Sequence, residues 1–309
     1  MPIIQGGKVV VTGGAGFIGS HLAEELAKGN EVIIIDDLST GSEANITPLL
    51  IHANIRYVRG SIADLDLLQE TLKDTDFVFH QAAISSVPKS IEDPLASNQA
   101  NITGTLNVLV AARDNRIRKV VFASSSSVYG DTPILPKKED MHPNPMSPYA
   151  LTKLTGEYYC KIFQQIYGLP TICLRYFNVY GPKQNPDSQY AAVIPKFIKR
   201  LSQNKSPIIF GDGNQTRDFI FIKDVVEANI LAALSESTGI FNIGSGKNIS
   251  LNELAQIIMN IMGVRLEPIH QDQIPGDVKH SLADIAKAKT FGYNPNYSLE
   301  EGIKNIIKH

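Results

Sequence analysis

Short apolar runs rich in β-branched residues alternate with longer helical patterns through the first half of the chain. The apolar runs, each typical of a buried strand, cover residues 8–12, 31–36, 54–59, 76–80, 119–124 and 170–176. Between them, apolar residues at helical spacing predict helices over 16–28, 94–116 and 149–167. Continuous apolar strands separated by helices indicate a parallel sheet covered on both faces, and right-handed crossovers make that sheet doubly wound.

The regular alternation weakens in the second half of the chain. Shorter helical patterns over 194–203, 223–234 and 251–262 stand among short strands and loops rich in glycine, proline and asparagine. We interpret this part as a smaller α/β cap over the carboxyl edge of the sheet, where folds of this kind bind ligands. The chain is therefore expected to divide into regions 1–180 and 181–309, with a boundary that chain segments can cross.

A glycine-rich turn follows the first predicted strand directly. In the segment GGAGFIG over 13–19, Gly13, Gly16 and Gly19 stand at the spacing of a dinucleotide-binding turn. Glycine allows the tight turn, lets the backbone approach a pyrophosphate, and lets the helix pack closely on the strand. The helix N-terminus then offers free N–H groups to the phosphates. The strand before and the helix after the turn favour a Rossmann-like α/β domain that binds a dinucleotide.

Two acidic residues end the second predicted strand. Asp36 stands 20 residues after Gly16, the distance expected for a carboxylate that accepts hydrogen bonds from an adenosine ribose. Asp36 and Asp37 would repel a 2′-phosphate, and no lysine or arginine occurs between them and Glu43. The cofactor is therefore expected to be NAD and not NADP.

Composition excludes several other classes of function. Lys and Arg together number 29 against 31 Asp and Glu, and no basic stripe with interleaved aromatics occurs, so nucleic acid and anionic membrane surfaces are not expected partners. No apolar run reaches the ~18 residues of a membrane span, and the N-terminus lacks a secretory layout. Cys160 and Cys173 are expected to be reduced thiols, and the histidines show no metal-ligand spacing with them. We expect a cytoplasmic protein without a metal site.

Candidate catalytic residues lie on the helix predicted over 149–167 and on the strand before it. Tyr149 and Lys153 are separated by four residues, so they share one helix face. A nearby ammonium group favours phenolate and lowers a tyrosine pKa from ~10 toward the working pH, where the tyrosine can act as a general base. The hydroxyl cluster over 124–127 follows a predicted sheet strand, and one of its members can relay a proton to Tyr149.

Four segments in this order, GGAGFIG, SSSSVYG, PYALTK and RYFNVYGP, resemble the extended short-chain dehydrogenase/reductases, and specifically the nucleotide-sugar 4-epimerases (UDP-hexose 4-epimerase family). The resemblance runs from about residue 8 to the C-terminus. It implies that Ser125 relays a proton, that Tyr149 is the base, and that Lys153 tunes this base and holds the nicotinamide ribose. By position it also implies a cofactor site made of Gly13, Gly16, Phe17, Ile18, Gly19, Asp36, Asp37, Ser39, Thr40, Gly41, Ile62, Ala82, Ala83, Asn101, Ser124, Lys153 and Tyr176.

The resemblance further implies a UDP-sugar site. Asn178 and Arg217 fall where the family holds the diphosphate, and Asp277 falls where it binds the uridine ribose. The residues that the resemblance implies to bind the substrate are Ser85, Ser125, Ser126, Tyr149, Asn178, Val193, Arg217, Asp277 and Ser281. The implied reaction is a reversible redox cycle at sugar C4 through a transient 4-keto sugar, with NAD bound tightly and regenerated in every turnover. The family also implies a homodimer formed through the helices near 94–116 and 149–167.

Particular positions distinguish members of the family. Sugar-nucleotide 4,6-dehydratases carry acidic residues where this chain has Ser126 and Ser127, and uronate epimerases carry an arginine after the Gly-Pro pair that Lys183 follows here. Epimerases confined to glucose and galactose have a bulky tyrosine where this chain has Ser281, and a serine leaves space for a 2-acetamido group. We therefore expect UDP-GlcNAc and UDP-GalNAc to be accepted as well as UDP-Glc and UDP-Gal; the alternative is a strict UDP-glucose/UDP-galactose 4-epimerase. The segments over 85–88 and 189–195 also resemble the N-acetyl subgroup.

Two positions depart from the family pattern. Ile274 replaces an arginine that contacts the diphosphate, which leaves Arg217 as the main cationic clamp, and Ser61 replaces an aspartate near the adenine.

Two other functions are the alternatives to an epimerase. A non-catalytic NAD-sensing protein would be expected to lack Tyr149, Lys153 or Ser125, and all three are present. A net UDP-sugar dehydrogenase or reductase shares these residues and differs in exchanging NAD with solvent.

Overall fold

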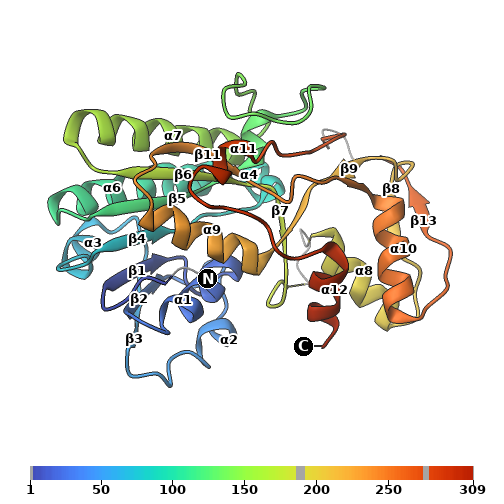
Figure 1. Ribbon diagram of the computed structural model, residues 1–309, viewed down its shortest axis with the longest axis horizontal. Helices are drawn as coiled ribbons and strands as arrows, with labels where there is room; N and C mark the ends of the chain where they lie inside the picture. The colour runs from blue at the N-terminus through green and yellow to red at the C-terminus, as the bar shows by residue number, and fades with distance from the viewer. Residues whose placement is uncertain (1–2, 186–191, 274–277, 309) are drawn as a thin grey trace.

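The computed structural model describes residues 3–185, 192–273 and 278–308. These residues form a seven-stranded sheet whose neighbouring strands all run parallel. Its order is β11 (Gly239–Ile243), β6 (Thr171–Tyr176), β5 (Lys119–Ser125), β4 (Phe77–His80), β1 (Lys8–Thr12), β2 (Glu31–Asp36) and β3 (Ile55–Arg59). The doubly wound, Rossmann-like α/β fold predicted from the alternating pattern is confirmed (Figure 1).

The strands are apolar throughout because they are covered on both faces. Val9 and Val11 of β1 belong to one core cluster, and Val10 between them belongs to the other. Helices α1 (Phe17–Leu26) and α9 (Ile222–Leu234) cover the first face, through residues such as Leu22. Helices α3 (Leu65–Thr71), α6 (Gly104–Asp114) and α7 (Pro148–Tyr167) cover the second.

The helix predicted over 94–116 is interrupted, which corrects that expectation. It consists of α5 (Pro94–Asn98), a π-helical turn over Gln99–Thr103, and α6. The π turn places the amide of Asn101 in the interior, where it bonds to the backbone of Ile84. Gly104 follows the turn at a point where a Cβ atom would lie 2.5 Å from Ile62 Cδ1. Wide turns of this kind recur at functional sites.

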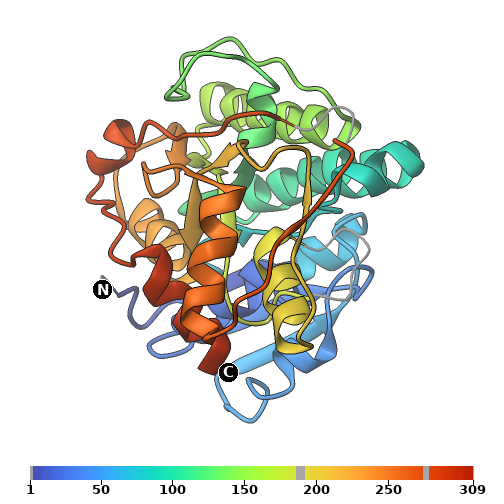
Figure 2. The same ribbon diagram turned by 90° about the vertical axis from the view of Figure 1, so that its right-hand side faces the viewer.

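A second, smaller group of elements lies beside the carboxyl edge of the sheet. Figure 2 faces this group and shows α10 and α12 in front, with α8 beside them. Its elements are β7 (Asn178–Tyr180), α8 (Val193–Ser202), β8 (Ile208–Phe210), β9 (Thr216–Arg217), β10 (Phe219–Phe221), β12 (Ile249–Ser250), α10 (Leu251–Met262), β13 (Ile269–Gln271) and α12 (Leu299–Lys308). The segment 222–243 returns to the sheet as α9 and β11, so it crosses the boundary expected near residue 180. The division at residue 180 stays a prediction.

Several short helices had no clear periodic signal in the sequence. They are α2 (Glu43–Ile46), α3 (Leu65–Thr71), α4 (Val87–Glu92) and α11 (Ala286–Lys289), together with a 3₁₀ turn over Ser126–Tyr129. Local caps start two of the unpredicted helices: Asp64 accepts a hydrogen bond from Leu67 N at the start of α3, and Ser86 accepts one from Lys89 N at the start of α4. Caps of one or two hydrogen bonds are sufficient for helices of this length when neighbouring elements pack on them.

Candidate active site

A pocket runs across the carboxyl ends of the central strands. It begins at the turn after β1, passes the ends of β2 and β3, and finishes between β4, β5 and β6. Of the residues predicted to bind the cofactor, those that line it are Gly13, Gly16, Phe17, Ile18, Gly19, Asp36, Asp37, Ser39, Thr40, Ile62, Ala82, Ala83, Ser124, Lys153 and Tyr176. The carboxyl ends of the strands meet at one sheet edge, which is why residues at the ends of six strands gather here with residues of α7.

Close packing explains the glycines of the turn. Gly13 adopts a φ of +70°, and a Cβ atom there would lie 2.6 Å from the Ala82 backbone. A Cβ atom on Gly19 would lie 2.2 Å from the Gly13 carbonyl oxygen, within the turn itself. Helix α1 then begins at Phe17 without a side-chain cap. Its N-terminus lines the pocket, where it offers a favourable position for phosphate groups.

Two carboxylates line the pocket at the end of β2. Asp36 is buried, and its oxygens accept hydrogen bonds from Ala15 N at 2.9 Å and Leu38 N at 2.8 Å. Burial raises the pKa of Asp36, while these two backbone hydrogen bonds lower it. Asp37 is exposed and accepts a hydrogen bond from Ser39 N at 2.9 Å. A ribose diol suits these acceptors and a 2′-phosphate does not, so the residues present fit NAD.

Lys153 and Tyr149 lie at the far end of this pocket, on the first two turns of α7. The helix starts with Pro148, and the Ser147 hydroxyl caps it by accepting from Ala150 N at 3.2 Å. Lys153 is buried and its Nζ donates to the Ala123 carbonyl at 2.8 Å. Burial lowers the pKa of Lys153 to about 8.

Tyr149 contacts the hydroxyl cluster at the end of β5. Burial raises the pKa of Tyr149, and a hydrogen bond with the Ser125 side chain acts in the opposite direction. The Lys153 ammonium lies 5.9 Å from the centroid of the Tyr149 ring. Ser125 is thus the neighbour that lowers the pKa of the phenol, and its role as a proton relay stays a prediction.

A second cavity adjoins the first and shares Ser85, Tyr149 and Tyr176 with it. It lies between the hydroxyl cluster, β7 and the segment around His280. Of the residues predicted to bind substrate, it gathers Ser85, Ser125, Ser126, Tyr149, Asn178, Arg217 and Ser281. Arg217 Nη1 donates to the carbonyl oxygens of Thr216 at 3.1 Å and Lys279 at 3.3 Å. His280 also lines this cavity.

Some predicted residues lie elsewhere. Gly41 and Asn101 do not line the cofactor pocket, and Val193, the first residue of α8, lines neither cavity. Gly41 instead packs against Ala15 and Asp36, where a Cβ atom would come within 2.9 Å. The predicted Asp277, and Ile274 with it, lie outside the described residues.

Asn101 acts on the site indirectly. Its Oδ1 accepts from Ile84 N at 2.8 Å, and its Nδ2 donates to Thr152 Oγ1 at 3.0 Å. Thr152 in turn donates to the Tyr149 carbonyl at 2.8 Å. Asn101 therefore ties the loop after β4 to the first turn of α7. The sequence alone gave no sign of this role, because the π turn that directs the amide inward was not predicted.

Sequence reasoning also missed three polar residues at the site. Gln81 lines the cofactor pocket and donates to Tyr176 Oη at 3.1 Å. Ser127 lines the second cavity, and its buried Oγ has no partner among the described residues. Lys137 also lines the second cavity, and burial lowers its pKa. The position of Ser127 in the hydroxyl cluster was a usable signal, whereas Lys137 comes from a distant loop.

His80 illustrates a histidine of the core. Its ring nitrogens lie 2.8 Å from Thr12 Oγ1 and 2.9 Å from Thr105 Oγ1. Burial lowers the pKa of His80 to about 3, so the ring is neutral at working pH.

The residues that the structure describes contain no group of three or more His, Cys, Asp or Glu side chains that could hold a metal ion. Among the same residues no helix is both long and apolar enough to cross a membrane.

Comparison with known proteins places this site in a family. Residues 9–244 match the NAD dependent epimerase/dehydratase family. A putative UDP-glucose 4-epimerase of Methanocaldococcus jannaschii is 45% identical over 302 residues, covering 97% of each chain. The structure of a UDP-N-acetylglucosamine 4-epimerase from Methanobrevibacter ruminantium, in complex with UDP-N-acetylmuramic acid, is 45% identical with a TM-score of 0.96, over 99% of this chain and 98% of that one.

A third similar protein carries the cofactor. The UDP-glucose 4-epimerase of Thermus thermophilus, solved in complex with NAD, is 35% identical with a TM-score of 0.88, over 98% of each chain. The similarity thus extends over nearly the whole chain. The chain belongs to the NAD dependent epimerase/dehydratase family.

Proposed function

We propose that this protein is an NAD-dependent UDP-hexose 4-epimerase that accepts UDP-GlcNAc and UDP-GalNAc as well as UDP-Glc and UDP-Gal. One observation carries the proposal: the dinucleotide pocket and the second cavity meet at Tyr149, and Ser125 lines the second cavity beside it. A base at the junction of two ligand sites is placed for proton transfer in a reaction between the two ligands. The similar proteins that are named as UDP-hexose 4-epimerases support the same reaction.

The residues of this chain divide the chemistry among them. The glycine turn, the N-terminus of α1 and the β2 carboxylates would hold NAD, which when bound supplies a reversible two-electron oxidation of the sugar. Tyr149 takes the proton of the sugar 4-hydroxyl, with Ser125 relaying it, and later returns a proton to the same oxygen. Lys153, protonated, stabilises the phenolate that forms. Arg217 and Asn178 would bind the diphosphate, so the sugar can turn while the nucleotide stays anchored.

The second cavity argues against the dehydratase branch of the same family. Elimination of water requires an acid close to the sugar. The described residues that line this cavity include no aspartate or glutamate, and its hydroxyl groups come from Ser85, Ser125, Ser126, Ser127, Ser281, Tyr149 and Tyr176. Epimerisation requires no such acid, because the proton removed at the 4-hydroxyl is returned to the same oxygen.

Ser281 is proposed to admit the 2-acetamido group. It lines the second cavity, and its backbone N–H donates to Thr216 O at 3.0 Å, which fixes its position beside Arg217. A small side chain leaves space there, whereas a large one excludes a bulky substituent sterically. The strict UDP-glucose/UDP-galactose enzyme is the alternative that this position argues against.

Replacing Ser281 by tyrosine should abolish turnover of UDP-GlcNAc selectively. We expect kcat/KM to fall by a factor of about 100 or more for UDP-GlcNAc, but by less than about tenfold for UDP-Glc, because one added ring fills the space of the acetamido group. Ser281→Ala is the control and should keep both activities. The measurement is chromatography of UDP-sugars incubated with purified protein. An equal loss of kcat/KM for UDP-GlcNAc and UDP-Glc would contradict this role of Ser281.

The homodimer is proposed to form through the outer faces of α7 and α5. Leu151, Tyr158, Ile162 and Ile166 of α7 are all exposed, from 43% to 68%, and they recur at helical spacing. Leu95 of α5 is 81% exposed. Helices α5 and α7 contact each other, and we infer that these residues belong to one apolar face. A continuous face of this kind is typical of an interface between subunits.

Replacing Ile162 by glutamate should convert the dimer into a monomer. Burying one isoleucine stabilises an interface by about 2 kcal/mol, and burying a carboxylate without a partner costs more, so dimerisation should weaken by at least a hundredfold. Ile51→Glu, at an isoleucine that is 81% exposed outside this face, is the matched control. The measurement is sedimentation equilibrium, and a dimer of unchanged affinity would contradict the assignment.

We also propose that the protein is cytoplasmic. The free and buried thiols of Cys160 and Cys173 support this location.

A further inference from the structure

A buried ion pair lies directly behind the catalytic end of the cofactor pocket. Glu157 stands on α7, one turn beyond Lys153, and Arg175 stands on β6; their side chains are 2% and 1% exposed. Arg175 donates to Glu157 through Nε at 2.8 Å and through Nη2 at 2.7 Å. Burial lowers the pKa of Arg175, but the hydrogen bond and charge of Glu157, together with the contact with Tyr129, outweigh burial and raise it, so the guanidinium stays charged.

The third hydrogen bond to Glu157 comes from the cofactor site. The Ser124 hydroxyl donates to Glu157 Oε1 at 2.5 Å, and Ser124 lines the pocket next to Lys153. A serine hydroxyl has one proton and two acceptor lone pairs. Because the carboxylate takes this proton, Ser124 presents only acceptor lone pairs to the pocket. It can therefore bind an N–H group there, such as the carboxamide of a nicotinamide.

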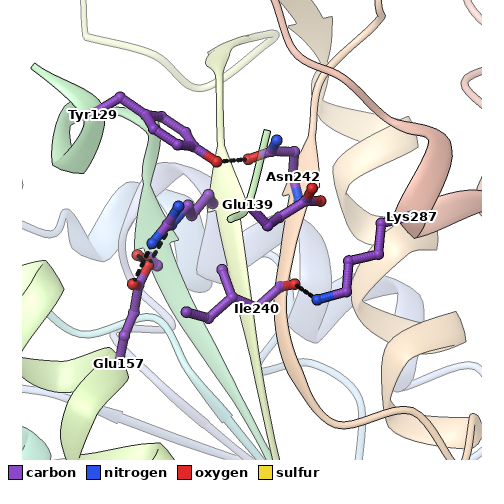
Figure 3. A network of polar contacts seen from close by, with 8 residues as sticks. Tyr129, Glu139, Glu157, Ile240, Asn242 and Lys287 are labelled. Carbon is purple, nitrogen blue, oxygen red and sulfur yellow. Dashed lines mark hydrogen bonds and ion pairs between the residues drawn. The ribbon is translucent and has the colours of Figure 1, made fainter. Parts of the chain in front are cut away.

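The ion pair is anchored on its far side by a longer network, part of which Figure 3 shows around Glu157, Tyr129 and Asn242. The Arg175 guanidinium lies 4.6 Å from the centroid of the Tyr129 ring, and Tyr129 Oη donates to Asn242 Oδ1 at 2.7 Å. Asn242 N donates to Glu139 Oε1 at 2.8 Å. The network thus joins α7, β6 and β11, while Arg175 Nη1 is buried without a hydrogen-bond partner among the described residues.

We propose that Glu157, held by Arg175, is a positioning residue that fixes the Ser124 hydroxyl as a hydrogen-bond acceptor for the nicotinamide end of NAD. A buried ion pair is weak evidence for stability, since apolar replacements of similar volume are often as stable. The carboxylate that faces Ser124 is therefore better explained by the orientation it imposes. This inference rests on the proposed function for its role in turnover, but not for its effect on NAD retention.

The test replaces both charges together, because removing one would leave the other buried without a partner. The double variant Glu157→Leu with Arg175→Met should keep its thermal midpoint within a few degrees of wild type. It should nevertheless lose NAD about tenfold faster on dialysis, the effect of one lost hydrogen bond, and lower kcat by a similar factor with little change in KM for the UDP-sugar. Bound NAD is measured by its absorbance after release from denatured protein.

Two further variants separate positioning from a structural role. Ser124→Ala should accelerate NAD loss to the same degree, and adding it to the double variant should change nothing more. Tyr129→Phe breaks the network beyond Arg175, and should lower the thermal midpoint while NAD retention stays at the wild-type level. Unchanged NAD retention in the folded double variant, or effects that multiply with Ser124→Ala, would overturn the proposal. A different outcome would contradict the proposed function alone: the variants lose NAD as expected, but the wild-type protein epimerises no UDP-hexose.

Discussion

Tyr149→Phe should lower kcat for UDP-hexose epimerisation by a factor of about 10² to 10⁴, the usual contribution of a positioned general base. The substitution removes one oxygen from a side chain that lines the second cavity together with Ser125. Its ring still fills the junction between the two cavities. Bound NAD and affinity for UDP should therefore stay within about twofold of wild type, because neither depends on the acid–base step. The measurement is steady-state kinetics together with NAD content.

The matched control for this prediction is Tyr167→Phe. Tyr167 ends the same helix, is 49% exposed and lies outside both cavities. Its loss of a hydroxyl should leave kcat unchanged. Epimerisation at the wild-type rate by Tyr149→Phe would remove Tyr149 from the mechanism, and the hydroxyl cluster would then need another base.

Gly19→Ala should largely abolish retention of NAD. The new Cβ atom would lie 2.2 Å from the Gly13 carbonyl oxygen and 2.8 Å from Gly14 Cα, both backbone atoms of the turn. The turn has to shift away from α1, and overpacking of this kind costs about 1–3 kcal/mol, or roughly 5- to 150-fold in affinity. We expect purified Gly19→Ala to contain little NAD, as measured by absorbance after denaturation.

Gly29→Ala is the control for the glycine prediction. A Cβ atom on Gly29 would meet Ile4 O at 3.1 Å, outside the cofactor pocket, so a small local adjustment suffices. This variant should retain NAD like wild type. A Gly19→Ala protein that keeps its full complement of NAD would show that the turn tolerates the shift and does not determine cofactor binding.

The architecture of the sheet was predictable because its strands are buried on both faces. Val10 packs on one side and its neighbours Val9 and Val11 on the other, so the whole run must be apolar and stands out from helical periodicity. The short helix α3 was not predictable in the same way. It is seven residues long, and its start depends on one cap from Asp64. A helix this short carries too few apolar positions to define a period.

The candidate site was predictable where it depends on local spacing. The glycine turn, the carboxylates of β2 and the Tyr149–Lys153 pair each follow from residues close together in the chain, and they line one pocket. Residues that act through distant contacts were harder to place. Asn101 is directed inward by a π turn, and Lys137 reaches the second cavity from a loop that pairs with Ala283. Such contacts depend on the tertiary fold, which local spacing does not encode.

The most direct test is the conversion of UDP-GlcNAc by the purified wild-type protein without added NAD. An epimerase that retains its cofactor should form UDP-GalNAc until the two sugars reach equilibrium, and should reach the same ratio from UDP-GalNAc. No reduced cofactor should accumulate, because each oxidation is followed by a reduction. Formation of an oxidised sugar together with NADH, or no conversion of UDP-GlcNAc or UDP-Glc in either direction, would contradict the assignment as a UDP-hexose 4-epimerase.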